Sequence, residues 1–301
     1  MKAKIIGLLL ATVSAGYAQE VNDSLSLKVV YDAKIKKCNQ LPHSAAKFSL
    51  DLWGNEASLF YMSENPEIAI RKQKFAEHTG RQFPELKAAA THPLEDGCAW
   101  SSYVVQKNNP KPDTLKSWYC FGNNTLYYYE PIPAQDWQPE DGDTLIADYA
   151  CQKARCDFRG RQWTVWYTLD IPYSNGPWKL GGLPGLILKA DDAAGDFSFT
   201  CISISTAKEK VVLPLPYRDK LPFQEIKEVT PDAMQRELKT HLANIVTIEE
   251  SMQFIFSESN LPSREEIDAM HAKLDSERRK RTACLIEDFG TPKDESKKKK
   301  K

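Results

Sequence analysis

The feature that most constrains the fold is a succession of short segments in which apolar and polar residues alternate, separated by turn signals. The segment 25–31 reads LSLKVVY, so its odd-numbered side chains share one side of an extended strand. Two further segments flank the turn at 53–56, and two more flank NNPKPD at 108–113. Because hairpins place consecutive strands antiparallel, we expect a β-dominated α+β fold built on a large, curved antiparallel sheet.

The C-terminal third has the pattern of helices. Thr230 followed by Pro231 is typical of an N-cap with proline at the first helical position. Ser263 and Glu266 have the spacing of a capping box, and a thin apolar stripe follows them. We therefore expect C-terminal helices packed on one face or edge of the sheet, with a last short strand at 284–289.

The first eighteen residues are typical of a secretory signal peptide. Lys2 and Lys4 precede an apolar run, and small residues precede an expected cleavage site between Ala18 and Gln19. No later stretch reaches about 18 apolar residues, so no transmembrane segment is expected. We expect an exported protein of the periplasm, outer membrane surface or medium. Residues 19–290 then form a single domain and residues 291–301 a disordered basic tail.

The charge balance argues against nucleic acid as a partner. The chain has 40 basic and 41 acidic residues, and the basic ones include the terminal run Lys297–Lys301. The folded part is therefore mildly acidic, whereas proteins that bind nucleic acid present basic patches. The tail could make weak contact with an anionic surface, at about 1 kcal/mol per lysine near such a surface.

The chain has seven cysteines, an odd number, so at least one stays outside any intramolecular disulfide. Disulfides are expected in an exported protein. A hairpin centred on Asn109 would place Cys98 opposite Cys120, within reach of a disulfide. No cysteine and histidine spacing suits zinc, and no sequence pattern points to a cofactor.

The densest stretch of the sequence runs from 136 to 192. Arg159-Gly160 predicts a tight hairpin that places Cys156 opposite Trp163 and Ala154 opposite Val165. The following GPWKLGGLPGLIL, at 176–188, concentrates glycine and proline beside an apolar run. Glycine permits positive φ or close backbone approach, and proline ends a strand, so this stretch predicts a corner between two strands.

The same stretch resembles the GLPGLI family, a group of exported bacterial proteins without an assigned activity. Gly182–Ile187 spells the family's signature, and four upstream motifs occur in matching order and spacing: CQKA (Cys151–Ala154), FRGR (Phe158–Arg161), WYTLDIP (Trp166–Pro172) and NGPWKLGG (Asn175–Gly182). The resemblance supports the fold expectation but implies no catalytic residue and no cofactor.

Two functions remain open. The first is a non-catalytic envelope module that binds an unknown ligand or an envelope protein, because aromatic rings with a few polar groups suit sugar or peptide segments. Its candidate ligand contacts are Trp166, Tyr167, Tyr173, Trp178 and Lys179. The alternative is a hydrolase acting on glycan or peptide near Trp166–Trp178, which would need two carboxylates, such as Glu130 and Asp170, or a Cys/His pair to converge. The same aromatics would also suit a core.

A calcium site is a weaker possibility. Asp136, Glu140, Asp141 and Asp143 form an acidic stretch, but they lack the order of an EF-hand loop. We therefore expect these side chains to be solvated and the chain to hold no metal.

Overall fold

The computed structural model describes residues 25–54, 57–64, 77, 103–121, 124–206, 225–245 and 263–287. The predicted signal peptide, Cys98 and the basic tail lie outside the described residues. The cleavage site, the Cys98–Cys120 disulfide and the limits of the domain therefore stay predictions.

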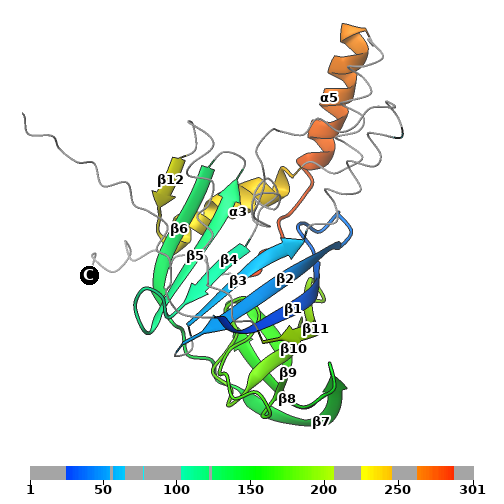
Figure 1. Ribbon diagram of the computed structural model, residues 1–301. Helices are drawn as coiled ribbons and strands as arrows, with labels where there is room; N and C mark the ends of the chain where they lie inside the picture. Colours follow the sequence, from blue (N-terminus) through cyan, green and yellow to red (C-terminus); the bar gives the residue numbers. More distant parts are fainter. Residues whose placement is uncertain are drawn as a thin grey trace, which may run out of the picture.

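The described residues form one mixed but mainly antiparallel sheet of twelve strands (Figure 1). In chain order the strands are β1 Leu25–Ile35, β2 Ser44–Trp53, β3 Ala57–Glu64, β4 Tyr103–Lys107, β5 Thr114–Phe121, β6 Asn124–Pro131, β7 Gln138–Ile146, β8 Tyr149–Phe158, β9 Arg161–Thr168, β10 Leu186–Asp192, β11 Phe197–Ser205 and β12 Glu225–Glu228. Their order in the sheet is β12-β6-β5-β4-β3-β2-β1-β11-β10-β9-β8-β7, and β12 pairs with β6 in parallel. The β-dominated α+β fold class is confirmed.

The sheet is strongly curved, because a short linker joins two strands that lie far apart in its order. The segment 132–137 connects β6 to β7 and can span at most about 25 Å. In a flat sheet, ten strand spacings of roughly 4.8 Å would hold these strands about 48 Å apart. Figure 1 shows the result: the β7–β11 meander folds under the β1–β6 meander.

The inside of this curve is filled by the chain between β9 and β10, which contains the glycine- and proline-rich corner. Asn175 donates to the Ser58 hydroxyl on β3 at 2.9 Å. The Tyr31 hydroxyl on β1 donates to the Ile187 carbonyl at 2.7 Å. The corner thus crosses to the opposite meander and packs in the main hydrophobic core.

Both predicted helix starts are confirmed. Thr230 caps α3, Pro231–Ala243, which buries Met234, Leu238 and Leu242 in the main core. Ser263 and Glu266 form a capping box at the start of α5, Arg264–Arg278. In α5 only Leu274 is buried, and Figure 1 shows this helix projecting away from the sheet.

One predicted hairpin register is wrong. Tyr103 pairs with Tyr119 and Val104 with Trp118, so the β4–β5 hairpin is centred two residues beyond Asn109. The cause is local: the Asn108 side chain accepts from the Asp113 amide at 2.8 Å and closes a longer loop. The predicted Cys98–Cys120 disulfide depended on a hairpin centred on Asn109, so the observed register removes its basis.

Two further expectations need correction. The predicted C-terminal strand is not formed over its described part, 284–287; Ala283, just before it, makes an isolated bridge with Cys38. The cysteines whose side chains are described are all free thiols: Cys38, Cys151, Cys156, Cys201 and Cys284.

Candidate functional site

The β8–β9 hairpin that leads into the site has the predicted register. Cys156 pairs with Trp163 and Ala154 with Val165. Arg159 and Gly160 both have positive φ, of 53° and 75°, as the two central residues of a type I′ hairpin turn require. The hairpin register is thus set by local turn chemistry, and the corner begins where β9 ends.

Close backbone approach explains two glycines of the corner. A Cβ at Gly185 would lie 1.9 Å from the Thr168 carbonyl oxygen, and one at Gly176 would lie 2.8 Å from Ile187 Cβ. Both positions therefore exclude any side chain. Gly182 differs, because its φ of +85° is the reason for glycine there.

Lys179 lies inside the protein between two carboxylates. Its Nζ is 2.5 Å from Glu287 Oε2 and 2.7 Å from Glu130 Oε1, and the lysine side chain is fully buried. Arg159 forms a further ion pair with Glu130. This cluster joins the corner, strand β6 and the C-terminal segment.

Tyrosine hydroxyls complete the cluster. Tyr119 and Tyr128 donate to Glu287 Oε1 at 3.1 and 2.6 Å. Burial and the carboxylates of Glu287 and Glu130 raise the pKa of Tyr128, so its phenol stays protonated as a donor. Every charge of the cluster therefore has hydrogen-bonded partners, as a buried ion cluster requires.

Beside the corner lies a cleft of about 420 Å³, here called the Lys107 cleft. Its walls come from the end of β4 and the loop after it, from the β6–β7 linker and from the corner. The residues that line it include Lys107, Asp113, Ile132, Asn175, Lys179 and Gly181.

The β6–β7 linker is held against the corner by three hydrogen bonds. Gln135 Nε2 donates to the Lys179 carbonyl at 2.9 Å, and Gln135 Oε1 accepts from the Gly181 amide at 3.2 Å. Trp137 Nε1 donates to the Gly181 carbonyl at 2.8 Å. One wall of the Lys107 cleft is therefore fixed to the other by side chains of the linker.

Lys107 is the unusual group of the cleft. It is only 5% exposed, and its Nζ donates to Asn175 Oδ1 at 2.9 Å and to the Leu180 carbonyl at 2.6 Å. Both acceptors are neutral, and among the described residues no carboxylate forms an ion pair with this amine. Burial lowers the pKa of Lys107 to about 7, so the amine changes between its charged and neutral forms near neutral pH.

The structure separates the five residues predicted as ligand contacts. Trp178 is fully buried, with its ring centroid 5.6 Å from that of Trp163. Tyr167 is buried and donates to Gln152, while Tyr173 is half-buried against the core. Trp166 is half-buried under Lys189, whose amine lies 4.4 Å from the ring centroid. Of the five, Lys179 alone lines the Lys107 cleft.

Lys107, Asn175 and Gln135 were not predicted from the sequence as residues of the site. Lys107 ends a strand beside a turn, where a lysine is usually solvated, so no local pattern distinguishes it. Asn175 directly precedes the stretch predicted as a corner, and its bond to the lysine joins residues 68 positions apart. A pairing at this range depends on the curvature of the sheet.

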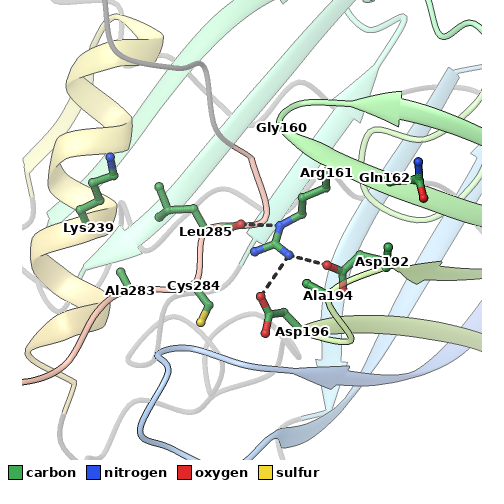
Figure 2. A pocket seen from close by; sticks show the side chains of 11 residues that line it. Gly160, Arg161, Gln162, Asp192, Ala194, Asp196, Lys239, Ala283, Cys284 and Leu285 are labelled. Atoms are coloured by element: carbon green, nitrogen blue, oxygen red, sulfur yellow. Dashed lines mark hydrogen bonds and ion pairs between the residues drawn. The ribbon is translucent and has the colours of Figure 1, made fainter.

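A second cavity, of about 500 Å³, lies where the C-terminal segment crosses the ends of β9 and β10 (Figure 2). Arg161 Nε donates to the Leu285 carbonyl at 2.7 Å, and the same guanidinium pairs with Asp192 and Asp196. Figure 2 shows Lys239 of α3 on the far side of this cavity. Because Arg161 already has three partners, we assign it to fastening the C-terminal segment.

Of the expected solvated acidic stretch, Asp136 lies in the β6–β7 linker and the other three residues lie in β7. Glu140 pairs with Lys153 at 2.9 Å and with Arg155 at 3.1 Å. Within the described ranges, no three metal-ligating side chains come together. Among the described helices, none has the length and apolar character needed to cross a membrane.

Comparisons with known proteins identify a family segment without an assigned activity. A family model described as "Protein of unknown function (Porph_ging)" matches residues 159–189, which contain the β8–β9 turn, β9 and the corner. No curated protein matches the chain.

Some solved structures show distant likeness. Two structures of PNGF-II, in space groups P21 and C2, are similar over 71% of this chain and 33% of theirs, with 15% and 14% identity and TM-scores of 0.42 and 0.43. This chain thus spans about a third of the PNGF-II chain. A LolA superfamily protein, NE2245 from Nitrosomonas europaea, is similar over 64% of this chain and 88% of its own, with 10% identity and a TM-score of 0.24. TM-scores below 0.5 do not establish a common fold.

Proposed function

We propose that this chain is an exported envelope protein of the GLPGLI family that binds a small ligand in the Lys107 cleft without chemical conversion. The observation that carries the proposal is Lys107 itself: a buried amine that borders a cleft and has only neutral acceptors. Buried amines are normally paired with carboxylates, so a group of this kind beside a cleft is a binding-site candidate.

The family motif supports the same cleft. The glycine- and proline-rich corner supplies Asn175, Lys179 and Gly181 to the lining. Residues 159–189, matched by the family model, contain all three. The segment that carries the resemblance thus also shapes the cleft, which gives the concentration of glycine and proline a role beyond turning the chain.

The hydrolase alternative is less well supported. Two carboxylates do converge on Lys179, as a glycosidase would require. However, the Glu287 and Glu130 side chains are only 2% and 10% exposed, and both are ion-paired with the buried Lys179, which leaves little of either carboxylate for a substrate. Asp170 is exposed, and among the described residues no ion pair joins it to this cluster. Burial raises the pKa of Cys151 to about 11, which disfavours the thiolate that a nucleophile needs.

Export is tested by expressing the full chain in a Gram-negative host and measuring the intact mass of the periplasmic product. We expect cleavage after Ala18. A product that keeps residues 1–18, or one found only in the cytoplasm, would contradict export while leaving the cleft proposal standing.

Binding is tested by amide NMR of the mature chain with butyrate, butyramide, butylamine and glucose as separate probes. We expect at least one probe to shift resonances of cleft residues. Ala134→Trp, at an exposed position on the cleft wall, should abolish these shifts. Ala150→Trp, at an exposed position on β8, is the matched control and should keep them. Absence of shifts at the cleft with every probe would contradict the proposal.

A further inference from the structure

We infer that the ligand of the Lys107 cleft carries a carboxylate or another oxyanion, and that this group accepts a hydrogen bond from Lys107 Nζ. The inference rests on the proposed function, because it names the chemistry of the ligand for the same cleft. It follows from a comparison of the two buried lysines that line that cleft.

The two lysines differ in their countercharges. Lys179 has Glu287 and Glu130 within 2.7 Å of its Nζ. Lys107 has Asn175 Oδ1 and the Leu180 carbonyl oxygen, which carry no net charge. A buried ammonium without a countercharge is unfavourable, so an anion is the component that this second site lacks.

The geometry leaves one position of the Lys107 amine for a ligand. A lysine ammonium has three donors, and two of them are directed to Asn175 and Leu180. Lys107 and Gly181 both line the cleft, and because Gly181 has no Cβ, its side of the amine is not covered by a side chain; a Cβ there would contact Nζ at 3.8 Å. The third donor therefore has room for an acceptor from the cleft.

Other charged groups around the cleft do not replace a bound anion. Asp113 lines the cleft but is exposed, and it forms no ion pair with Lys107. The charge of Lys179 is neutralised by its two glutamates. An anion in the cleft would thus interact with one uncompensated amine.

The rest of the ligand would contact an apolar wall. The linker side of the cleft is lined by Pro131, Ile132, Pro133 and Ala134. A small acid with a short apolar body therefore fits both halves of the site, with its oxyanion at Lys107 and its carbon chain against the linker.

Binding of an anion should be coupled to proton uptake. With a pKa of about 7, Lys107 is only partly protonated at neutral pH, and an anion binds its protonated form. By linkage, a bound oxyanion raises the apparent pKa of Lys107, and affinity falls as the pH rises from 6 to 9. Neutral probes should show neither effect.

The experiment compares butyrate, monobutyl phosphate, butyramide and butylamine by NMR titration at pH 6.5, with the Lys107 side-chain carbon resonance as a second readout. We expect an anionic probe to bind at least tenfold more tightly than butyramide, and to raise the apparent pKa of Lys107 by at least one unit. The two anions distinguish a carboxylate from a phosphate.

Three variants test the role of Lys107, and their amide spectra separate a loss of binding from a loss of folding. Lys107→Met should remove the preference for anions, whereas Lys189→Met, at a lysine outside the cleft, should keep it. Asn175→Asp supplies a resident carboxylate at the same amine and should also abolish anion binding. Amide spectra of each variant show whether it is folded.

The outcomes separate the two proposals. Binding of butyramide in the cleft as tightly as an anion, or unchanged anion binding in a folded Lys107→Met, would overturn the oxyanion inference but leave a binding cleft. Absence of binding by every probe would overturn both.

Discussion

Lys179 and Glu287 lie 108 positions apart in the sequence, yet Lys179 Nζ donates to Glu287 Oε2 at 2.5 Å inside the curved sheet. The contact brings the glycine- and proline-rich corner together with the C-terminal segment. Tyr119 on β5 and Tyr128 on β6 bind the same glutamate, so four parts of the chain meet at one carboxylate.

This ion pair predicts strong coupling between its partners. Glu287→Gln should lower the free energy of unfolding by about 3 kcal/mol, because the Lys179 charge stays buried with one countercharge fewer. The double variant with Lys179→Met should lose less than the sum of the two single losses. Urea unfolding monitored by tryptophan fluorescence measures all three. The surface pair of Lys153 with Glu140 is the control, since Lys153→Met should cost less than about 1 kcal/mol. Strictly additive losses would contradict a coupled pair.

Lys107 predicts a dependence of stability on pH. Burial lowers the pKa of this amine from 10.5 to about 7, so between these values the unfolded chain binds more protons than the folded one. Its contribution to stability therefore rises with pH across that window, by at most about 1.4 kcal/mol per unit. The unfolding free energy of the wild type minus that of Lys107→Met should thus increase from pH 7 to pH 9.

Subtracting the unfolding free energy of Lys107→Met from that of the wild type cancels the contributions of other titratable groups, some of which change stability in the opposite direction. Burial raises the pKa of Cys151 and Tyr128, which lowers stability as the unfolded forms ionise above about pH 9. The corresponding difference for Lys189→Met, at a lysine outside the cleft, is the comparison, and the rise for Lys107→Met should exceed it. Equal slopes for the two variants would show that burial does not lower the pKa of Lys107.

For two glycines we expect losses of stability of very different size from the same substitution. Gly185→Ala would place a Cβ 1.9 Å from the Thr168 carbonyl oxygen, a backbone atom that has no room to move. We expect a loss above about 4 kcal/mol or failure to fold. Gly195→Ala meets nothing within 4 Å and carries only the strain of φ +71°, about 1 kcal/mol. Thermal melts followed by circular dichroism compare the two, and equal losses would contradict the close approach at Gly185.

We expect Arg161 to stabilise both the C-terminal segment and the whole fold. Arg161→Met releases the Leu285 carbonyl and leaves the carboxylate of Asp192, 1% exposed, without its cation (Figure 2). We expect a loss of about 3 kcal/mol and faster hydrogen exchange at the Cys284 amide, which donates to the Lys37 carbonyl at 3.0 Å. Arg155→Met, at an exposed pair with Glu140, is the control and should change neither. Unchanged exchange at Cys284 would contradict the fastening role.

Features set by neighbouring residues could be predicted. The register of the β8–β9 hairpin follows from Arg159-Gly160, because a two-residue turn leaves little freedom. The starts of α3 and α5 follow from Thr230 and Ser263, whose side chains accept from amides three residues ahead. The β4–β5 register was missed because an Asn108 side-chain bond lengthened the loop.

The candidate site was predicted only in part. The corner was located, and Lys179 was named from it, but the prediction placed Trp178 at a ligand where the structure packs it against Trp163. An aromatic residue beside glycine and proline suits a core or a cleft equally well, since the hydrophobic effect is non-directional and favours contact with the protein interior and with a ligand alike. The side of the sheet that the ring faces decides whether it lies in the core or in a cleft.

By itself the sequence determined the strand segments, the helix starts and the corner, because alternation, caps and glycine act over a few residues. The tertiary structure alone decided that two buried lysines share one cleft, and that Lys179 meets two glutamates while Lys107 meets none among the residues that the structure describes. The physical reason is the curvature of the sheet, which brings together side chains as far apart in the sequence as Tyr119 and Glu287, 168 positions. The balance of buried charge depends on these long-range contacts, so it cannot be predicted from a local sequence pattern.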